Sequence, residues 1–454
     1  MRLARPSRLV CSVVASGCVA LVTPARALGF QPADTRGDGT GAELRWDASE
    51  PVAFRMHFAG SSEIAPLNLQ LLMREAFGSW AEVASADLGF EEGHVFVGSA
   101  SHHLGPSEVD GESAIFFVEA QWPHGPQVIA LTSVSFQADG TIVDADIAFN
   151  GADHAFTTGD SEIVKDFLSI ATHEVGHFLG LSHSAGGEAT MFAEYLDGDT
   201  SLRDLASDDV EGVSYLYPCG FEPCENGVTW VDSGAACATS GDPPGVGFAA
   251  LGLLGWAFAR RRVARRLRVL GVALTVGLAA VLAAAPASSS LVLAIPLAEL
   301  ARGGDRVVRG EVLSAEGTLD GIVKTRVLLR VDEDLLGGGE ELVEIEVLGG
   351  LLDVPQEVFT ADGTPRPQRI AGTLVFGAPR MQVGEEVVVI LDAAASGPMG
   401  VRGLAQGLFR VEPDGTLTQD LRGLAFARSG GRSPLPIQAP RTLAALRDEV
   451  RGAR

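Results

Sequence analysis

HEVGHFLGLSH, residues 173–183, is the stretch from which the rest of this 454-residue sequence can be interpreted. His173 and His177 stand four residues apart, one helical turn, so a helix presents both imidazoles on the same face. Gly180 lets the backbone leave that helix in a conformation that other residues resist. His183 can then return as a third ligand. Three neutral imidazoles suit Zn²⁺, and a fourth position left for water distinguishes a catalytic zinc from a structural one.

Glu174 is the expected general base of this site. It follows the first histidine but points elsewhere, close enough to take a proton from water on the zinc. The metal lowers the pKa of that water, and the carboxylate later passes the proton to the leaving amine. The alternative is three ordinary surface histidines. It requires a chance match to the five fixed residues of HExxHxxGxxH, expected on the order of once in ten thousand chains or more rarely.

The residues around the motif mix helical and extended patterns, which predicts an α+β domain at about 38–218. A helix is expected over 67–83, with an apolar face made of Leu71, Leu72, Ala76, Phe77 and Trp80. Extended segments are expected at 52–58, 95–97, 114–118, 128–136 and 142–149. The motif helix is expected to begin near Asp160-Ser161-Glu162, an N-cap with acid in the first turn. Its inward residues are then Ile163, Val164, Phe167, Leu168, Ile170 and Ala171.

With these residues the segment resembles the metzincin zinc proteases, whose motif is followed by a methionine turn, here Ala189-Thr190-Met191-Phe192. Within that class it is most similar to a bacterial matrixin. The matching features are Ser184 after the third histidine, Tyr195 four residues past the methionine, and segments 76–80, 140–147 and 205–217. The resemblance covers about 170 residues and nothing beyond Pro218. It implies a twisted sheet with an active-site helix.

The resemblance also implies roles for individual residues. Zinc is held by His173, His177 and His183, Glu174 is the base, and Met191 lies beneath the histidines without binding the metal. The strand around Ile129, Ala130 and Leu131 is implied to pair with an extended protein or peptide substrate. Ala193 replaces the proline common after the methionine turn, so the wall of the S1′ pocket is expected to differ. His102, His103, Asp110 and His124 do not have the spacing of the second, structural zinc of animal matrixins.

Negative charge is concentrated in the same segment. The chain carries a net charge of −24, and residues 28–218 hold 31 acidic against six basic residues. Such a domain does not bind nucleic acid by neutralising phosphates. It can bind a hard cation such as Ca²⁺, for which Asp144 and Asp146 are candidates, or simply present a solvated acidic surface.

The N-terminus is typical of a secretory signal peptide at 1–27. Three arginines precede an apolar stretch at 9–22 and a small-x-small cleavage site at 25–27, and that stretch is short for an uncleaved membrane anchor. The mature, exported chain would keep Cys219, Cys224 and Cys237, two of which are expected to form a disulfide.

Two apolar stretches follow a Cys/Gly/Pro linker at 219–244. Together they occupy 245–286 and flank a cluster of five arginines. They predict a transmembrane-like hairpin that tethers the protein to the cell envelope with both flanking domains outside. A buried helix pair is the alternative, and the second stretch also resembles another signal peptide, as if two exported proteins had been fused.

Residues 291–427 alternate apolar and polar residues in short runs between glycine-rich turns, which predicts an all-β barrel or sandwich, followed by a tail at 428–454. This domain shows no catalytic constellation. The leading hypothesis is therefore an exported zinc endopeptidase. The alternatives are an adhesion or binding protein with a vestigial zinc site, and a fusion whose halves act separately after cleavage near 285–288. Nothing in the sequence indicates an oligomeric state.

Overall fold

The structure is a computed structural model. It describes residues 29–96, 109–220, 224, 228–229, 290–337, 339–359, 365–394, 397–428 and 441–453. The expected signal peptide (1–27), the apolar hairpin (245–286) and Cys237 lie outside these residues. Among the described helices, none is long and apolar enough to cross a membrane.

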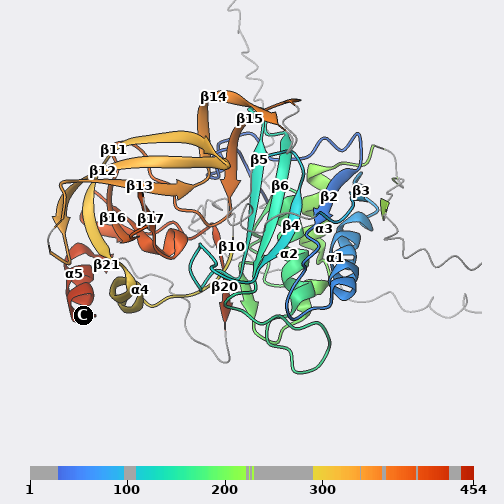
Figure 1. Cartoon of the computed structure of the whole chain (residues 1–454), viewed down its shortest axis with the longest axis horizontal. Coiled ribbons are helices and arrows are strands. Elements are labelled where there is room, and N and C mark those ends of the chain that lie inside the picture. The colour runs from blue at the N-terminus through green and yellow to red at the C-terminus, as the bar shows by residue number, and fades with distance from the viewer. Residues whose placement is uncertain are drawn as a thin grey trace, which may run out of the picture.

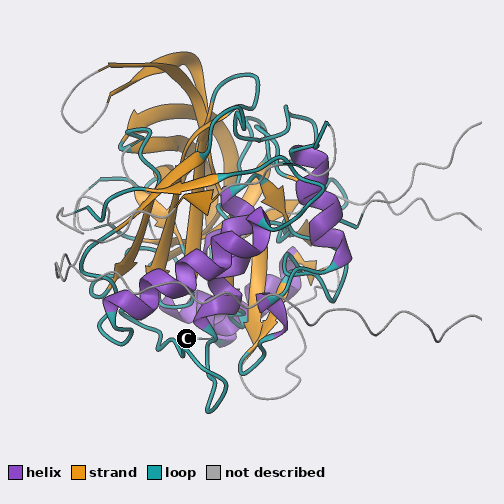
Figure 2. Ribbon diagram, turned by 90° about the vertical axis from the view of Figure 1, so that its right-hand side faces the viewer, coloured by secondary structure: helices purple, strands orange, loops and turns teal. Residues whose placement is uncertain are grey.

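A twisted sheet and three helices make up the N-terminal half (Figure 1). Its strands are β2 (Val52–Met56), β3 (Phe90–Glu92), β4 (Ala114–Val118), β5 (Ala130–Phe136) and β6 (Ile142–Asn150). They lie in the order β3-β2-β4-β6-β5, and β5 alone runs antiparallel to its neighbour. The helices are α1 (Pro66–Ala81), α2 (Phe167–Phe178) and α3 (Ser207–Leu216), with a short 3-10 helix at Ser201–Arg203. Figure 2 shows the helices in front of the strands.

Helix α1 forms where the sequence predicts it, and its buried face is as expected at Ala76, Phe77 and Trp80 but not at Leu71. The residues that face the core are Leu69, Met73, Ala76, Phe77, Trp80 and Ala81. Leu71, expected on this face, is 52% exposed. Phe77 stacks on Phe54 of β2 at 3.9 Å between ring centres, and that contact fixes the rotation of the helix.

Helix α2 begins later than the sequence predicts, because its N-cap is Asp166 and not the 160–162 segment. The Asp166 side chain accepts a hydrogen bond from the Ser169 amide (2.9 Å) and holds the Arg203 guanidinium at 2.6 Å. The segment before it folds back, with the Thr157 amide donating to the Lys165 carbonyl (2.8 Å). Val164 is therefore exposed and not a core residue. Of the expected strand at 95–97, the described residues 95 and 96 form only a bridge at Phe96, residue 97 lies outside the described residues, and β3 forms a few residues earlier.

The C-terminal half contains a closed β-barrel, which decides between the two architectures expected from its pattern. Its strands are β11 (Arg306–Asp320), β12 (Ile322–Asp334), β13 (Leu342–Leu348), β17 (Met399–Val401) and β16 (Glu386–Asp392), closed by pairing of β16 with β11. The sheet continues through β18 (Leu408–Val411), β19 (Thr416–Thr418) and β21 (Arg441–Thr442). Helices α4 (Leu297–Gly303) and α5 (Leu443–Gly452) pack on it, with a 3-10 turn at Leu404–Gly407.

The two halves share sheets as well as a core. Strands β14 (Gly350–Phe359) and β15 (Pro365–Val375) leave the barrel and continue the N-terminal sheet beyond β5. A separate parallel sheet combines β10 (Ser290–Leu293) and β20 (Leu424–Arg428) with β8 (Glu194–Leu196). Figure 1 shows these segments between the barrel and the N-terminal sheet. The alternating pattern of the sequence does not predict which chain segments pair across the two halves.

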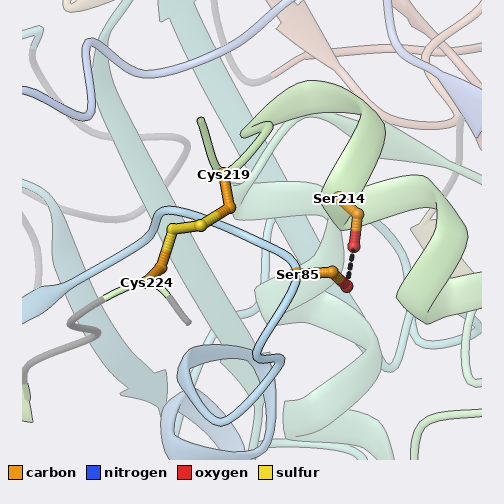
Figure 3. The surroundings of a disulfide bond; sticks show 4 residues. All are labelled: Ser85, Ser214, Cys219 and Cys224. Carbon is orange, nitrogen blue, oxygen red and sulfur yellow. Dashed lines mark hydrogen bonds between the residues drawn. A yellow bond between two sulfur atoms is a disulfide. The ribbon is translucent and has the colours of Figure 1, made fainter. Parts of the chain in front are cut away.

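A disulfide joins Cys219 to Cys224 just after α3 (Figure 3), which confirms that two of the three expected cysteines pair. Beside it, the Ser85 and Ser214 hydroxyls lie 2.6 Å apart. The chain then continues to β9 (Val228–Thr229), which adds to the edge of the sheet at β3. These contacts fasten the end of α3 to the loop that follows α1.

Candidate metal centre

The three histidines of the motif are brought together by α2 and the turn that follows it. His173 and His177 lie in the last turns of α2, which ends at Phe178. Gly180 then has φ of +89°, and a Cβ there would lie 2.3 Å from the Leu44 carbonyl oxygen, so only glycine fits. The following β7 (Leu181–Ser182) pairs with β1 (Gln31–Pro32) and delivers His183 to the helix.

The Nε2 atoms of the histidines point to one place. The Nε2 atom of His173 lies 3.1 Å from that of His177 and 3.2 Å from that of His183. Nitrogens bound to one tetrahedral zinc at about 2.0–2.1 Å are separated by roughly 3.3–3.4 Å. Among the described residues, this triad is the one group of three or more His, Cys, Asp or Glu side chains that converges closely enough to hold a metal ion.

Hydrogen bonds to carbonyl groups orient two of the rings. The Nδ1 atom of His173 donates to the Thr190 carbonyl (2.6 Å) and that of His177 to the Leu181 carbonyl (2.8 Å). Their Nε2 atoms therefore carry lone pairs, and two facing lone pairs at 3.1 Å repel unless a cation lies between them. Burial lowers the pKa of His173 to about 4, and burial together with the neighbouring imidazoles lowers those of His177 and His183. The donor set fits zinc.

Glu174 lies beside this triad and is completely buried. Burial raises its pKa to about 8, and a hydrogen bond from the Thr132 hydroxyl opposes that rise. Its Oε1 atom has no hydrogen-bond partner among the described residues. An unpaired buried carboxylate oxygen is costly unless a cation or water completes it. Thr132 was not singled out from the sequence, although it directly follows the expected substrate-binding residues.

Met191 packs against the middle of α2. A Cβ at Gly176, in the middle of α2, would lie 2.2 Å from the Met191 sulfur, so the methionine fills the space that this glycine leaves. The turn is held by Asp209, whose carboxylate accepts hydrogen bonds from the Thr190 amide (2.7 Å) and the Met191 amide (3.0 Å). In the sequence, Asp209 lies within the 205–217 segment, and no local pattern indicates this role.

The other predicted site residues lie on the central strands. Ile129 precedes β5, while Ala130 and Leu131 begin it, and all three are buried. Asp144 and Asp146 lie on β6 and are also buried, so neither belongs to a solvated surface.

Both aspartates bind main-chain amides of the 110–114 loop. Asp144 accepts from the Asp110 and Gly111 amides, both at 3.0 Å, and Asp146 accepts from the Ala114 amide at 2.8 Å. Burial, with the nearby carboxylates, raises the pKa of Asp144, and its Oδ1 atom has no hydrogen-bond partner among the described residues. Of the residues considered for a second zinc, His102 and His103 lie outside the described residues, and His124 packs edge-on against Trp122.

Comparison with known proteins identifies the N-terminal half. Residues 45–218 match the family described as Matrixin. Human matrilysin is 40% identical over 80 residues, which is 18% of this chain and 29% of that protein. Metalloendoproteinase 4-MMP of Arabidopsis thaliana is 28% identical over 178 residues, 38% of this chain and 48% of that protein.

A second Arabidopsis protein, metalloendoproteinase 2-MMP, is 47% identical over 64 residues, 14% of this chain and 16% of that protein. The chain therefore spans about half or less of the length of these curated relatives. The fold brings together a triad of histidines that can bind zinc, and the segment that contains it, residues 45–218, matches the matrixin family. Matrixins are zinc-dependent and contain structural calcium.

Replacing Gly176 by alanine tests the packing between α2 and the methionine turn. The added methyl group would overlap the Met191 sulfur and lie 2.8 Å from the Trp80 ring. We expect the free energy of unfolding to fall by about 1–3 kcal/mol, measured by urea denaturation with zinc in excess. The control is Gly78→Ala in α1, where nothing lies within 4 Å of the new Cβ. That change should be neutral or stabilise by about 0.5–1 kcal/mol. Equal stability losses in both variants would contradict this packing.

Proposed function

We propose that this protein is a zinc endopeptidase that hydrolyses peptide bonds in protein or peptide substrates. The observation that carries the proposal is the meeting of three buried imidazoles with the Glu174 carboxylate, all within one helix and its following turn. The names of the relatives, metalloendoproteinase and matrilysin, support the same chemistry for residues 45–218. A vestigial site in a binding protein would have no use for a buried carboxylate next to the ligands.

Glu174 acts as the general base. When bound, zinc polarises the peptide carbonyl and lowers the pKa of water. The Glu174 carboxylate takes one proton from the attacking water molecule, whose oxygen forms a bond to the carbonyl carbon. The carbon–nitrogen bond then breaks, and Glu174 returns the proton to the amine nitrogen. No covalent bond to the protein is needed.

Thr132 positions this base. Its hydroxyl donates to the Oε2 atom of Glu174, which leaves Oε1 to face the reacting water. The hydrogen bond stabilises the charged carboxylate and opposes the rise of its pKa that burial causes. Met191 supports the ligands from below. When its edge is free, the strand of Ile129, Ala130 and Leu131 holds an extended substrate through main-chain hydrogen bonds.

Two further parts of the proposal concern calcium and cellular location. Asp144, with its unpaired buried oxygen, and Asp146 are proposed to bind structural Ca²⁺ together with main-chain carbonyls. The basic and apolar N-terminal 27 residues support export, and the apolar segments within 245–286 support a tether to the cell envelope. Residues 291–427, which include the barrel, are proposed to be a β-rich domain without catalytic residues of its own.

Removing the base should separate metal binding from hydrolysis. We expect Glu174→Ala to retain one zinc per chain by elemental analysis, while kcat/KM for casein or a quenched fluorescent peptide falls by about 10²–10⁴-fold. His183→Ala should lose zinc as well as activity. Glu188→Ala, an exposed acid in the same loop, should change neither. Unchanged proteolysis in Glu174→Ala would remove the assignment.

The pH dependence tests Thr132. In Thr132→Val the hydrogen bond to the charged carboxylate is lost, so the pKa of Glu174 should rise. Since a general base must be deprotonated, the acid limb of the kcat/KM profile should move to higher pH. Thr132→Ser keeps the hydroxyl and should restore the wild-type limb. An unshifted limb in the valine variant, with normal zinc content, would show that Thr132 has no effect on the base.

Mass spectrometry of the mature protein tests export and tethering. Cleavage after Ala27 predicts an N-terminus at Leu28, and the tethered form predicts one chain that continues through 245–286 and fractionates with membranes. A retained Met1 would contradict export by this signal. Two fragments produced by cleavage of the chain near residues 285–288 would favour the fusion hypothesis.

A further inference from the structure

The edge of β5 is paired with the C-terminal half on both sides of Ala130 and Leu131 in this structure. Residues 133–136 pair antiparallel with 372–375 of β15, and the Phe376 amide donates to the Thr132 carbonyl (3.3 Å). Before β5, the Ile129 amide donates to the Leu291 carbonyl (2.9 Å), and the Leu293 amide donates to the Gln127 carbonyl (2.7 Å). An extended peptide can add to a sheet only along a free edge. The strand proposed to hold substrate is therefore already occupied by the C-terminal half.

The opposite wall of the site is occupied as well. The segment after the methionine turn forms β8, which pairs in parallel with β20, and the Phe426 amide donates to the Ala193 carbonyl (3.0 Å). On its other side β20 pairs with β10. Two strands of the C-terminal half thus fill the space between β5 and the chain beyond Met191.

The zinc ligands themselves are covered. The Phe376 ring stacks on the His177 imidazole, with 4.3 Å between ring centres and 25° between planes. His173, Glu174, His177 and His183 are at most 2% exposed. A catalytic zinc requires an open position for water and substrate, and this arrangement leaves no access to one.

The covering interface is apolar and well packed. Leu291, Leu374, Phe376, Ala425 and Ala427 belong to the same buried cluster as the core of the N-terminal half. Across the pairing of β5 with β15, the Ser135 and Thr373 hydroxyls lie 2.9 Å apart. Main-chain pairing, burial of apolar side chains and side-chain hydrogen bonds therefore all stabilise the same docked position of the C-terminal strands on the N-terminal half.

The occupying segment has the wrong backbone path for a substrate. The Phe376 carbonyl accepts a hydrogen bond from the Ser290 hydroxyl. Gly377 turns the chain away with φ of +80°, and a Cβ there would lie 2.8 Å from the Gly423 carbonyl oxygen. The main chain at Phe376, whose ring lies on His177, is thus held by contacts within the C-terminal half itself.

We propose that residues 290–293, 372–376 and 424–428 are an internal inhibitor of the zinc site, so that the chain is latent until these strands are displaced. The inference rests on the proposed peptidase function. Because the inhibitor is part of the same chain, its effective concentration is high, and a substrate must compete with it. The apparent affinity for any ligand of the cleft equals the intrinsic affinity multiplied by the fraction of molecules in which the strands are undocked. A small undocked fraction therefore means weak apparent binding.

The test compares two full-length variants that carry the same substitution. Leu374 is 3% exposed within the interface, and Leu342 is 48% exposed on barrel strand β13. Leu374→Asp buries a charge in the docked state and should favour undocking. We expect kcat/KM for a quenched fluorescent peptide to rise roughly tenfold or more, and the Kd of a tripeptide hydroxamate to fall by the same factor. Hydrogen exchange of the 133–136 amides should accelerate. Leu342→Asp should match the wild type in all three.

If Leu374→Asp does not fold, a second pair of variants tests the same inference. Gly377→Ala adds backbone strain and contacts the Gly423 carbonyl, whereas Gly384→Ala, with φ of +85° and nothing within 4 Å of its Cβ, adds the strain alone. Only Gly377→Ala should increase peptide hydrolysis and hydroxamate binding.

The outcomes separate this inference from the proposed function. If the wild type matches Leu374→Asp and Gly377→Ala in peptide hydrolysis and in hydroxamate affinity, latency is contradicted while the peptidase function stands. If Leu374→Asp or Gly377→Ala binds zinc and hydroxamate more tightly than the wild type but hydrolyses no peptide, the internal inhibitor is supported and the proposed peptidase function is contradicted.

Discussion

The structure depends on the convergence of three imidazole nitrogens at one point. The Nε2 lone pairs of His173 and His177 face each other at 3.1 Å inside a buried site, with the Nε2 atom of His183 at 3.2 Å from that of His173, and a cation between the nitrogens stabilises this arrangement. The surrounding fold serves this point. The helical spacing supplies two ligands, Gly180 returns the chain with the third, and Met191 fills the gap beneath Gly176. The carbonyl groups of Thr190 and Leu181 accept hydrogen bonds from Nδ1 of His173 and His177, which leaves the Nε2 atoms of these rings available to bind the metal.

The ligand set could be predicted from the sequence because each constraint acts over a few residues. A spacing of four in a helix and a glycine at the turn specify geometry locally. Thr132 could not be found this way, since its contact with Glu174 joins positions 42 residues apart on different elements. The start of α2 was missed for a similar reason. Asp166 caps α2 through the Ser169 amide, and its carboxylate is also held by Arg203, a partner 37 residues away that no local pattern indicates.

The fold of the C-terminal half was predictable in class but not in its pairings. Alternation of apolar and polar residues predicts strands, and closure of β16 on β11 makes them a barrel. Alternation does not indicate which edge a strand will meet, because any exposed edge offers the same main-chain groups. Residues 372–375 lie within the segment expected to form the barrel or sandwich, yet they pair with β5 of the other half. The covered zinc site is thus a property of tertiary pairing alone.

The nature of the interface also constrains how the halves can part. Strand β10 begins at Ser290, so a cut near 285–288 leaves all described pairings between the halves intact. The interface consists of main-chain hydrogen bonds and apolar side chains such as Leu374 and Phe376, which salt screens little. Cleavage of the connecting chain would therefore lower the effective concentration of the inhibitor without removing it. Strand β10 contacts the chain before β5 and also pairs with β20, which in turn pairs with β8. Release therefore requires that the inhibitor strands leave β5 and β8 together.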